Sequence, residues 1–72
     1  MADLKFEIIS HIAIISENKN GWTKELNLVS WNGRDAKFDI REWDEEHEKM
    51  SKGLTFTKEE ILKLKDAIDE IE

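Results

Sequence analysis

The sequence contains no cysteine, which excludes disulfide bonds and zinc sites built on thiolates. The chain has 72 residues, and a domain of that size buries only about 60% of its unfolded surface, so its core is small. Small domains gain stability from disulfides, a metal ion or a second chain. The two histidines, His11 and His47, lie far apart in the sequence. We therefore expect a homo-oligomer, and the lack of cysteine fits a reducing cytoplasm.

No apolar run is long enough to span a membrane. The run from Phe6 to Ile15 is interrupted by Glu7, Ser10 and His11. It is also too short, because a membrane span needs about 20 apolar residues. Only Lys5 precedes it as a nearby cation, and no small-residue cleavage site follows, so no secretory signal is predicted. We expect a cytoplasmic protein without a membrane partner.

Positive charge is scarce, with 11 basic against 17 acidic side chains and a net charge of −6. This total argues against nucleic-acid binding, because the phosphate backbone attracts basic surfaces. The excess acid is uneven, however: residues 1–43 carry six basic and seven acidic side chains, whereas residues 44–72 carry five and ten. A surface built from the first segment can be locally positive, with an affinity that relies on stacking.

Motifs for catalysis and cofactor binding are also absent. No serine stands in a recognisable motif with a histidine and an acid, and there is no glycine-rich phosphate loop. The acidic segment 44–48 lacks the glycine and the ligand spacing of a calcium loop. We interpret it as a solvated loop, and we predict a non-enzymatic protein without cofactor or metal.

The pattern of apolar and polar residues predicts a single α+β domain over residues 1–72. Strands are expected at about 4–16, 22–31, 34–43 and 53–56. Asn-Gly pairs at 20–21 and 32–33 predict tight hairpin turns. Thr57 and Glu60 form a capping-box pattern that starts a helix over about 58–71. We expect a meandering antiparallel sheet with the helix on one face and the other face open.

Alternation in the middle strands separates the two faces of this sheet. The predicted core face is apolar and consists of Leu26, Leu28, Ala36, Phe38 and Ile40. The predicted open face combines polar and aromatic residues and includes Glu25, Asn27, Val29, Trp31, Lys37, Asp39, Arg41 and Trp43. In the first strand, regular alternation would place Phe6, Ile8, Ser10, Ile12 and Ile14 together. Cations and aromatic rings on an open sheet face can hold a nucleic acid by pairing with phosphates and stacking on bases.

Two interpretations of the open face remain. Trp31 and Trp43 fit half-buried packing about as well as they fit base stacking. Arg41 fits an ion pair with Asp39 or Glu42, which contributes about 0–1 kcal/mol when exposed.

From about Lys24 onward the sequence resembles the positive cofactor 4 (PC4-like) family of transcriptional coactivators, and more closely its bacterial YdbC-type branch. The resemblance rests on Trp31-Asn32-Gly33-Arg34, Asp39-Ile40-Arg41-Glu42, Gly53-Leu54-Thr55-Phe56 and the helical pair Leu64-Lys65. It implies a curved four-stranded antiparallel sheet with a C-terminal helix. It also implies a dimer whose grooves bind single-stranded DNA.

The resemblance assigns roles to individual residues. Trp31 takes the place of a base-stacking aromatic, Arg34 that of a basic residue after the turn, and Arg41 that of the arginine in the shared Asp-Ile-Arg-Glu motif. Trp43 falls at or next to an aromatic position. The chain departs from the family where Asn32 replaces a typical lysine, where Val29 replaces an arginine that some members have, and where an extra residue lies near positions 35–36. These departures leave fewer cations in the groove.

The sequence therefore predicts sequence-tolerant binding of single-stranded DNA by the open sheet face of a homodimer, in support of transcription or DNA maintenance. Single-stranded RNA could bind as well, because stacking does not distinguish the sugar. The bacterial cytoplasm or nucleoid is the expected location. The predicted contacts are Asn27, Val29, Trp31, Asn32, Arg34, Lys37, Arg41, Trp43, Lys49 and Lys52. The alternative is an adaptor that binds a protein of the transcription machinery with the same face.

Overall fold

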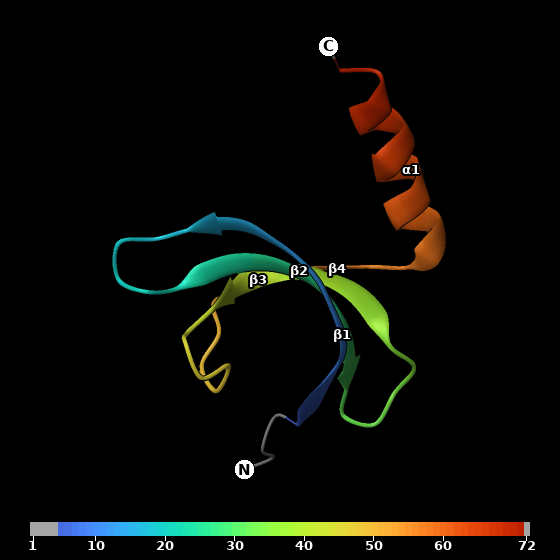
Figure 1. Cartoon of the computed structure of the whole chain (residues 1–72). Helices are drawn as coiled ribbons and strands as arrows, with labels where there is room; N and C mark the ends of the chain where they lie inside the picture. The colour runs from blue at the N-terminus through green and yellow to red at the C-terminus, as the bar shows by residue number, and fades with distance from the viewer. Residues whose placement is uncertain (1–4, 72) are drawn as a thin grey trace.

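The computed structural model describes residues 5–71, which form four strands and one helix (Figure 1). In chain order these are β1 (Phe6–Glu17), β2 (Thr23–Trp31), β3 (Lys37–Trp43), β4 (Leu54–Phe56) and α1 (Lys58–Asp69). The strands form one antiparallel sheet in the order β1-β2-β3-β4. The predicted α+β meander with a C-terminal helix is confirmed. Residue 4, the predicted start of the first strand, lies outside the described residues.

The second Asn-Gly pair and the helix cap adopt the conformations that the sequence predicts, whereas of the first pair only Gly21 has a positive φ, of 88°. Asn32 (φ 52°) and Gly33 (φ 75°) make the connection from β2 toward β3 in the left-handed region. At the helix start, the Glu60 backbone N–H donates to Thr57 Oγ1 at 3.2 Å, and the Thr57 N–H donates to Glu60 Oε1 at 2.8 Å. Such caps contribute about 1 kcal/mol to helix stability. Within residues 5–71, no helix has both the length and the apolar character needed to cross a membrane.

β1 does not alternate regularly, so the predicted grouping of its residues is wrong. Its register against β2 shifts after Ile8, after His11 and after Ile14. Each shift leaves one isoleucine without a partner residue, and the strand advances in units of three: Ile8-Ile9-Ser10, His11-Ile12-Ala13 and Ile14-Ile15-Ser16. Bulges of this kind bend a strand and increase its twist. The first strand is accordingly strongly curved in Figure 1.

The concave face of the curved sheet holds the most buried side chains, and the predicted assignment of core and open faces is therefore wrong for the single chain. At most 1% of the surface is exposed in Glu25, Asn27, Val29, Asp39 and Trp43. All of these were predicted on the open face. The apolar residues of the opposite, convex face, among them Leu26, Leu28, Phe38 and Ile40, are only partly buried. The curvature of the sheet explains why the buried face is the opposite of the predicted one, because it brings the side chains of the concave face together and shields them from solvent.

Aromatic rings and the loop 44–52 fill the concave face. The Phe6 ring centroid lies 5.7 Å from that of Trp31 and 5.1 Å from that of Trp43. From the loop, the His47 ring lies 5.8 Å from Trp43, and Met50 forms a β-bridge with the same tryptophan. Aromatic pairs add about 0.5–1.5 kcal/mol beyond their buried area. This cluster acts as the small core of the chain.

The helix α1 projects away from the sheet and does not cover it as predicted (Figure 1). Among the strands it approaches only β3 and β4, and none of its side chains is buried. Half or more of the side chain is exposed in Leu54, Ile68 and Ile71, at 65%, 54% and 73%. The apolar stripe of α1, which consists of Ile61, Leu64 and Ile68, therefore finds little surface to pack on within one chain.

Candidate nucleic-acid interface

A cavity of about 360 Å³ brings together four of the predicted contacts. Its lining consists of Trp31, Arg34, Asp35, Lys37, Arg41 and Thr55. The segment from the end of β2 to β3 supplies five of these side chains, and β4 supplies Thr55 because Thr55 pairs with Asp39. The site therefore combines residues as far apart in the sequence as Trp31 and Thr55, which are 24 positions apart.

The guanidinium carbon of Arg41 lies over the Trp31 ring, 4.5 Å from the ring centroid, in a cation–π contact. Its Nε and Nη2 donate to the two carboxylate oxygens of Asp39 at 2.6 and 2.7 Å. The predicted ion pair with Asp39 is confirmed, and it is partly buried rather than exposed. A bidentate pair fixes the guanidinium plane. It also compensates the arginine charge, so Arg41 offers a flat surface more than a free cation.

Trp31 is half-buried. Its ring contacts both Phe6 and Arg41, and its indole Nε1 has no hydrogen-bond partner within residues 5–71. Unpaired bases stack on aromatic rings and on guanidinium planes alike. The Trp31–Arg41 pair is therefore suited to receive a base, and direct stacking on Trp31 stays a prediction.

The free positive charge at this cavity comes from Arg34 and Lys37. Both side chains are exposed, and neither is in an ion pair with another described residue. Asp35 on the same rim offsets part of their charge. The exposed Asn32 accepts a hydrogen bond from the Lys5 backbone N–H at 3.1 Å, so it ties the start of β1 to the turn.

The remaining predicted contacts lie outside this cavity. Asn27, Val29 and Trp43 are fully buried on the concave face, and they could touch a ligand only if the loop 44–52 moved. Lys49 and Lys52 are exposed in that loop. Direct contacts by these five residues stay predictions.

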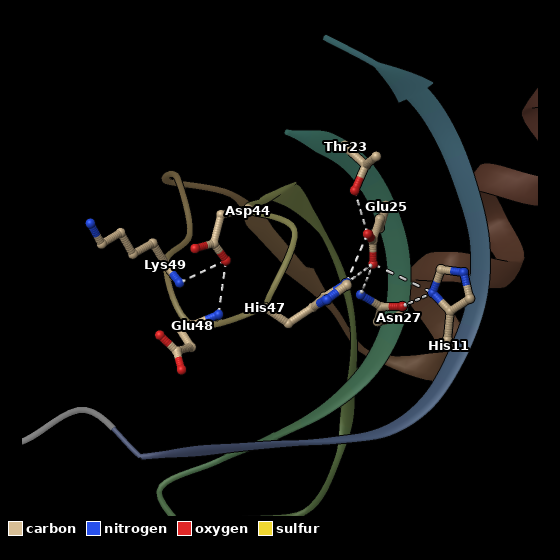
Figure 2. Close-up of polar contacts among 8 residues, drawn as sticks. All are labelled: His11, Thr23, Glu25, Asn27, Asp44, His47, Glu48 and Lys49. Atoms are coloured by element: carbon tan, nitrogen blue, oxygen red, sulfur yellow. Dashed lines mark hydrogen bonds and ion pairs between the residues drawn. The ribbon is translucent and has the colours of Figure 1, made fainter. Parts of the chain in front are cut away.

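The concave face holds a second polar cluster, which the sequence did not predict (Figure 2). Asn27 Nδ2 donates to Glu25 at 3.1 Å, and His47 Nε2 donates to the same carboxylate at 2.9 Å. His11 Nδ1 lies 3.4 Å from Glu25 and donates to Asn27 Oδ1 at 2.7 Å. The only signal in the sequence is the three-residue pattern of β1, which turns His11 toward Asn27, its partner across the sheet.

Glu25 keeps its charge at neutral pH despite its burial. Burial raises the pKa of this carboxyl, but hydrogen bonds from Thr23, Asn27 and His47 outweigh that effect and hold the pKa below its usual value. Both imidazoles turn an N–H toward acceptor oxygens. Within the described part of the chain, no three or more acidic or histidine side chains are arranged to hold a metal ion.

The loop 44–52 begins with a local cap. The backbone N–H groups of Lys49 and Glu48 donate to Asp44 Oδ1 at 3.1 and 2.9 Å. The Lys49 hydrogen bond is the main reason why the pKa of the Asp44 carboxyl lies below its usual value. The loop therefore has a defined shape and presents Glu45, Glu46 and Glu48 to solvent.

A curved sheet with a basic, aromatic cavity defines a class of small nucleic-acid-binding proteins, and comparison with known families agrees. Residues 18–67 match the family model of the transcriptional coactivator p15 (PC4), so the chain belongs to this family. Members of the family bind single-stranded DNA, form dimers and act as transcriptional coactivators. The predicted family is confirmed, whereas the YdbC-type branch stays a prediction.

The chain also has a relative in Treponema pallidum (strain Nichols), a protein described there only as uncharacterized. The two sequences are 42% identical over 67 residues, which cover 93% of this chain and 79% of the relative. The similarity thus includes β1, which lies entirely outside the family match.

Proposed function

We propose that this protein is a sequence-tolerant single-stranded DNA-binding protein that acts as a homodimer in transcription or DNA maintenance. The observation that carries the proposal is the stack of Arg41 on Trp31 beside the free cations Arg34 and Lys37. Grooves that bind single strands combine these same two elements, aromatic stacking and cations along the backbone. Membership in the family supports the same function.

In the proposed complex each group has one role. Arg34 and Lys37 pair with phosphates. A base stacks against the Trp31 ring and the Arg41 guanidinium that lies over it. Asp39 orients Arg41 and does not touch the ligand. Stacking tolerates every base because each has a π-face, whereas a duplex hides those faces. Single-stranded RNA would bind by the same contacts.

The homodimer is supported by the apolar surface that the single chain leaves uncovered. Leu54 on β4 and Leu62, Ile68 and Ile71 on or just after α1 are all about half exposed or more. Large exposed apolar patches mark protein interfaces. A second copy would cover the convex face and the helix stripe, and it would leave the cavity of Trp31 and Arg41 open to the nucleic acid.

The second candidate is an adaptor that binds a protein of the transcription machinery with the same face. One observation favours it: Asp39 already compensates the charge of Arg41, and the chain has a net charge of −6. Such a surface is less attractive to phosphate than that of a basic protein.

Fluorescence polarisation with labelled single-stranded DNA, duplex DNA and RNA of one sequence, each at two salt concentrations, separates the candidates. We expect single strands to bind well above duplex. The slope of log K against log salt should be roughly −2 to −3.5, for about three to five phosphate contacts. Equal affinity for single strands and duplex would indicate simple charge attraction. No binding of any nucleic acid would favour the adaptor.

A further inference from the structure

Both histidines of the chain converge on one buried carboxylate, although they lie far apart in the sequence. His11 comes from β1 and His47 from the loop 44–52, and both rings contact Glu25 of β2 (Figure 2). The side chains of His11 and His47 are 49% and 40% exposed, while that of Glu25 is 2% exposed. Solvent therefore reaches the two imidazoles but hardly reaches the carboxylate.

One row of paired residues across the sheet runs from this cluster to the basic cavity. His11 pairs with Asn27, Asn27 pairs with Asp39, and Asp39 pairs with Thr55 in the basic cavity. In the next row Glu25 lies opposite Arg41. Neighbouring strands are about 4.8 Å apart, so three spacings separate the two ends by about 14 Å along the sheet. A single strand that crosses the four strands would reach both ends.

The space beside the histidines has the character of a base-sized site. A cavity of about 290 Å³ lies between β1 and the loop, with Ile8 and Ile14 as apolar walls, the two imidazole rings at its sides, and Glu25 and Asn27 as its other lining. The polar side chains already satisfy one another by hydrogen bonds. This leaves stacking and charge as the means by which the site can hold a ligand.

We infer that the His11–Glu25–His47 cluster is a second contact for the nucleic-acid strand, one that engages when its histidines take up protons. With both imidazoles neutral, the cluster carries the single negative charge of Glu25 and repels phosphate. With both protonated, two positive charges outweigh that one, so the cluster itself no longer repels phosphate. Histidine is the side chain that ordinarily changes charge between about pH 5 and 8. This inference rests on the proposed function and adds a pH dependence to it.

Other charged groups face the cluster but do not reverse this effect. An adjoining cavity of about 430 Å³ shares Glu25 and His47 with it and adds Glu17 from β1 and Asp44 and Glu45 from the loop. Hydrogen bonds hold the pKa of Asp44 below its usual value. Carboxylates ordinarily titrate near pH 4, so they stay negative across the window in which histidine changes. Together with Glu25 they place four carboxylates around the two imidazoles, so the region stays net negative even when both histidines are protonated, and acidification acts by weakening its repulsion of phosphate.

The test is a polarisation titration with oligo(dT) of about 20 nucleotides, long enough to span both contacts, at about pH 8 and about pH 5.5. For the wild type we expect binding to strengthen about three- to tenfold on acidification, as one or two surface charge pairs would give. The salt slope should steepen by about 0.7–1.4, the value for one or two added phosphate contacts.

The double variant His11→Gln, His47→Gln should bind no more tightly at the lower pH than at the higher one. Glutamine keeps an N–H donor for Asn27 and Glu25 but takes up no proton. Lys63→Gln, on the exposed helix, is the control for loss of a charge elsewhere and should keep the wild-type pH response. Circular dichroism at both pH values confirms that each variant is folded.

If the double variant unfolds, Glu25→Gln tests the same inference. Glu25→Gln removes the negative charge and retains oxygen acceptors, so it should bind more tightly than the wild type at both pH values and still respond to acidification. An equal pH response in wild type and double variant would overturn the inference while leaving the proposed function intact. Absence of oligo(dT) binding by the wild type at both pH values would overturn both.

Discussion

At the scale of single residues, Trp31 and Arg41 form the surface on which the proposed function depends. We predict that Trp31→Ala lowers the affinity for single-stranded DNA by about 1–3 kcal/mol, the range for one stacked base. The salt slope should stay almost unchanged, because no phosphate contact is lost. Trp22→Ala is the matched control, since Trp22 is half-buried but lines a different cavity. Wild-type affinity in a folded Trp31→Ala protein would contradict the stacking role.

Glu25 gives the fold a dependence on pH whose sign follows from its lowered pKa. A carboxyl with a lower pKa in the folded state binds protons more weakly there than in the unfolded state. Its stabilising contribution is complete above its unfolded pKa, about 4.3 for glutamate, and is lost as the pH falls through the folded value. We therefore predict that the free energy of unfolding falls on acidification below about pH 5.

Urea denaturation of the wild type and Glu25→Gln across this range checks the prediction. The variant should lose less stability between about pH 5 and pH 3 than the wild type does. Parallel curves for the two proteins would mean that the hydrogen bonds to Glu25 do not shift its titration on folding.

At the scale of elements, the close approach of the segment before β4 to β3 sets the position of Arg41. A Cβ added at Gly53 would lie 2.4 Å from Arg41 Cβ and 2.4 Å from the Ile40 carbonyl oxygen. We predict that Gly53→Ala costs about 1–3 kcal/mol of stability through overpacking, and that it also weakens DNA binding because Arg41 must shift. Thermal unfolding and polarisation measure the two effects.

Gly33→Ala is the comparison for this variant. Nothing lies within 4 Å of a Cβ added at Gly33, but its φ of 75° is strained for alanine. This variant should lose stability with a much smaller effect on DNA affinity. Equal losses of affinity in the two variants would contradict the role of Gly53 in placing Arg41.

The strands and the helix could be predicted from the sequence, but the face of the sheet that is buried could not. Turn residues and the capping box depend on local chemistry, and Gly33 and Thr57 behave as expected. The core face was inverted because burial of Glu25 and Asp39 depends on curvature, which comes from bulges in β1 that regular alternation does not reveal. The histidine cluster was missed for the same reason. Of the candidate site, the gathering of Trp31, Lys37 and Arg41 could be predicted, because neighbouring strands carry them on one face, whereas Arg34 lies in the connection between β2 and β3.

At the scale of the whole molecule, the exposed apolar surface predicts self-association. Sedimentation should give about twice the mass of one chain at micromolar concentration, because a chain this small gains stability by burying apolar surface against a partner. The double variant Leu62→Glu, Ile68→Glu places charges on α1 positions that are 48% and 54% exposed, so one chain tolerates them and an interface does not. Glu59→Gln on the same helix is the control. A wild-type monomer at that concentration would contradict the proposed dimer.

The central claim is that single-stranded DNA binds at the cavity of Trp31 and Arg41. The most direct measurement is the NMR spectrum of the three tryptophan indole N–H groups during titration with oligo(dT). The Trp31 Nε1, which has no partner among the described residues, should shift most. The Trp22 signal should stay nearly constant, and an equal amount of duplex should leave all three in place. Movement of Trp22 alone, or a Trp31 signal unchanged at saturating oligonucleotide, would contradict the account.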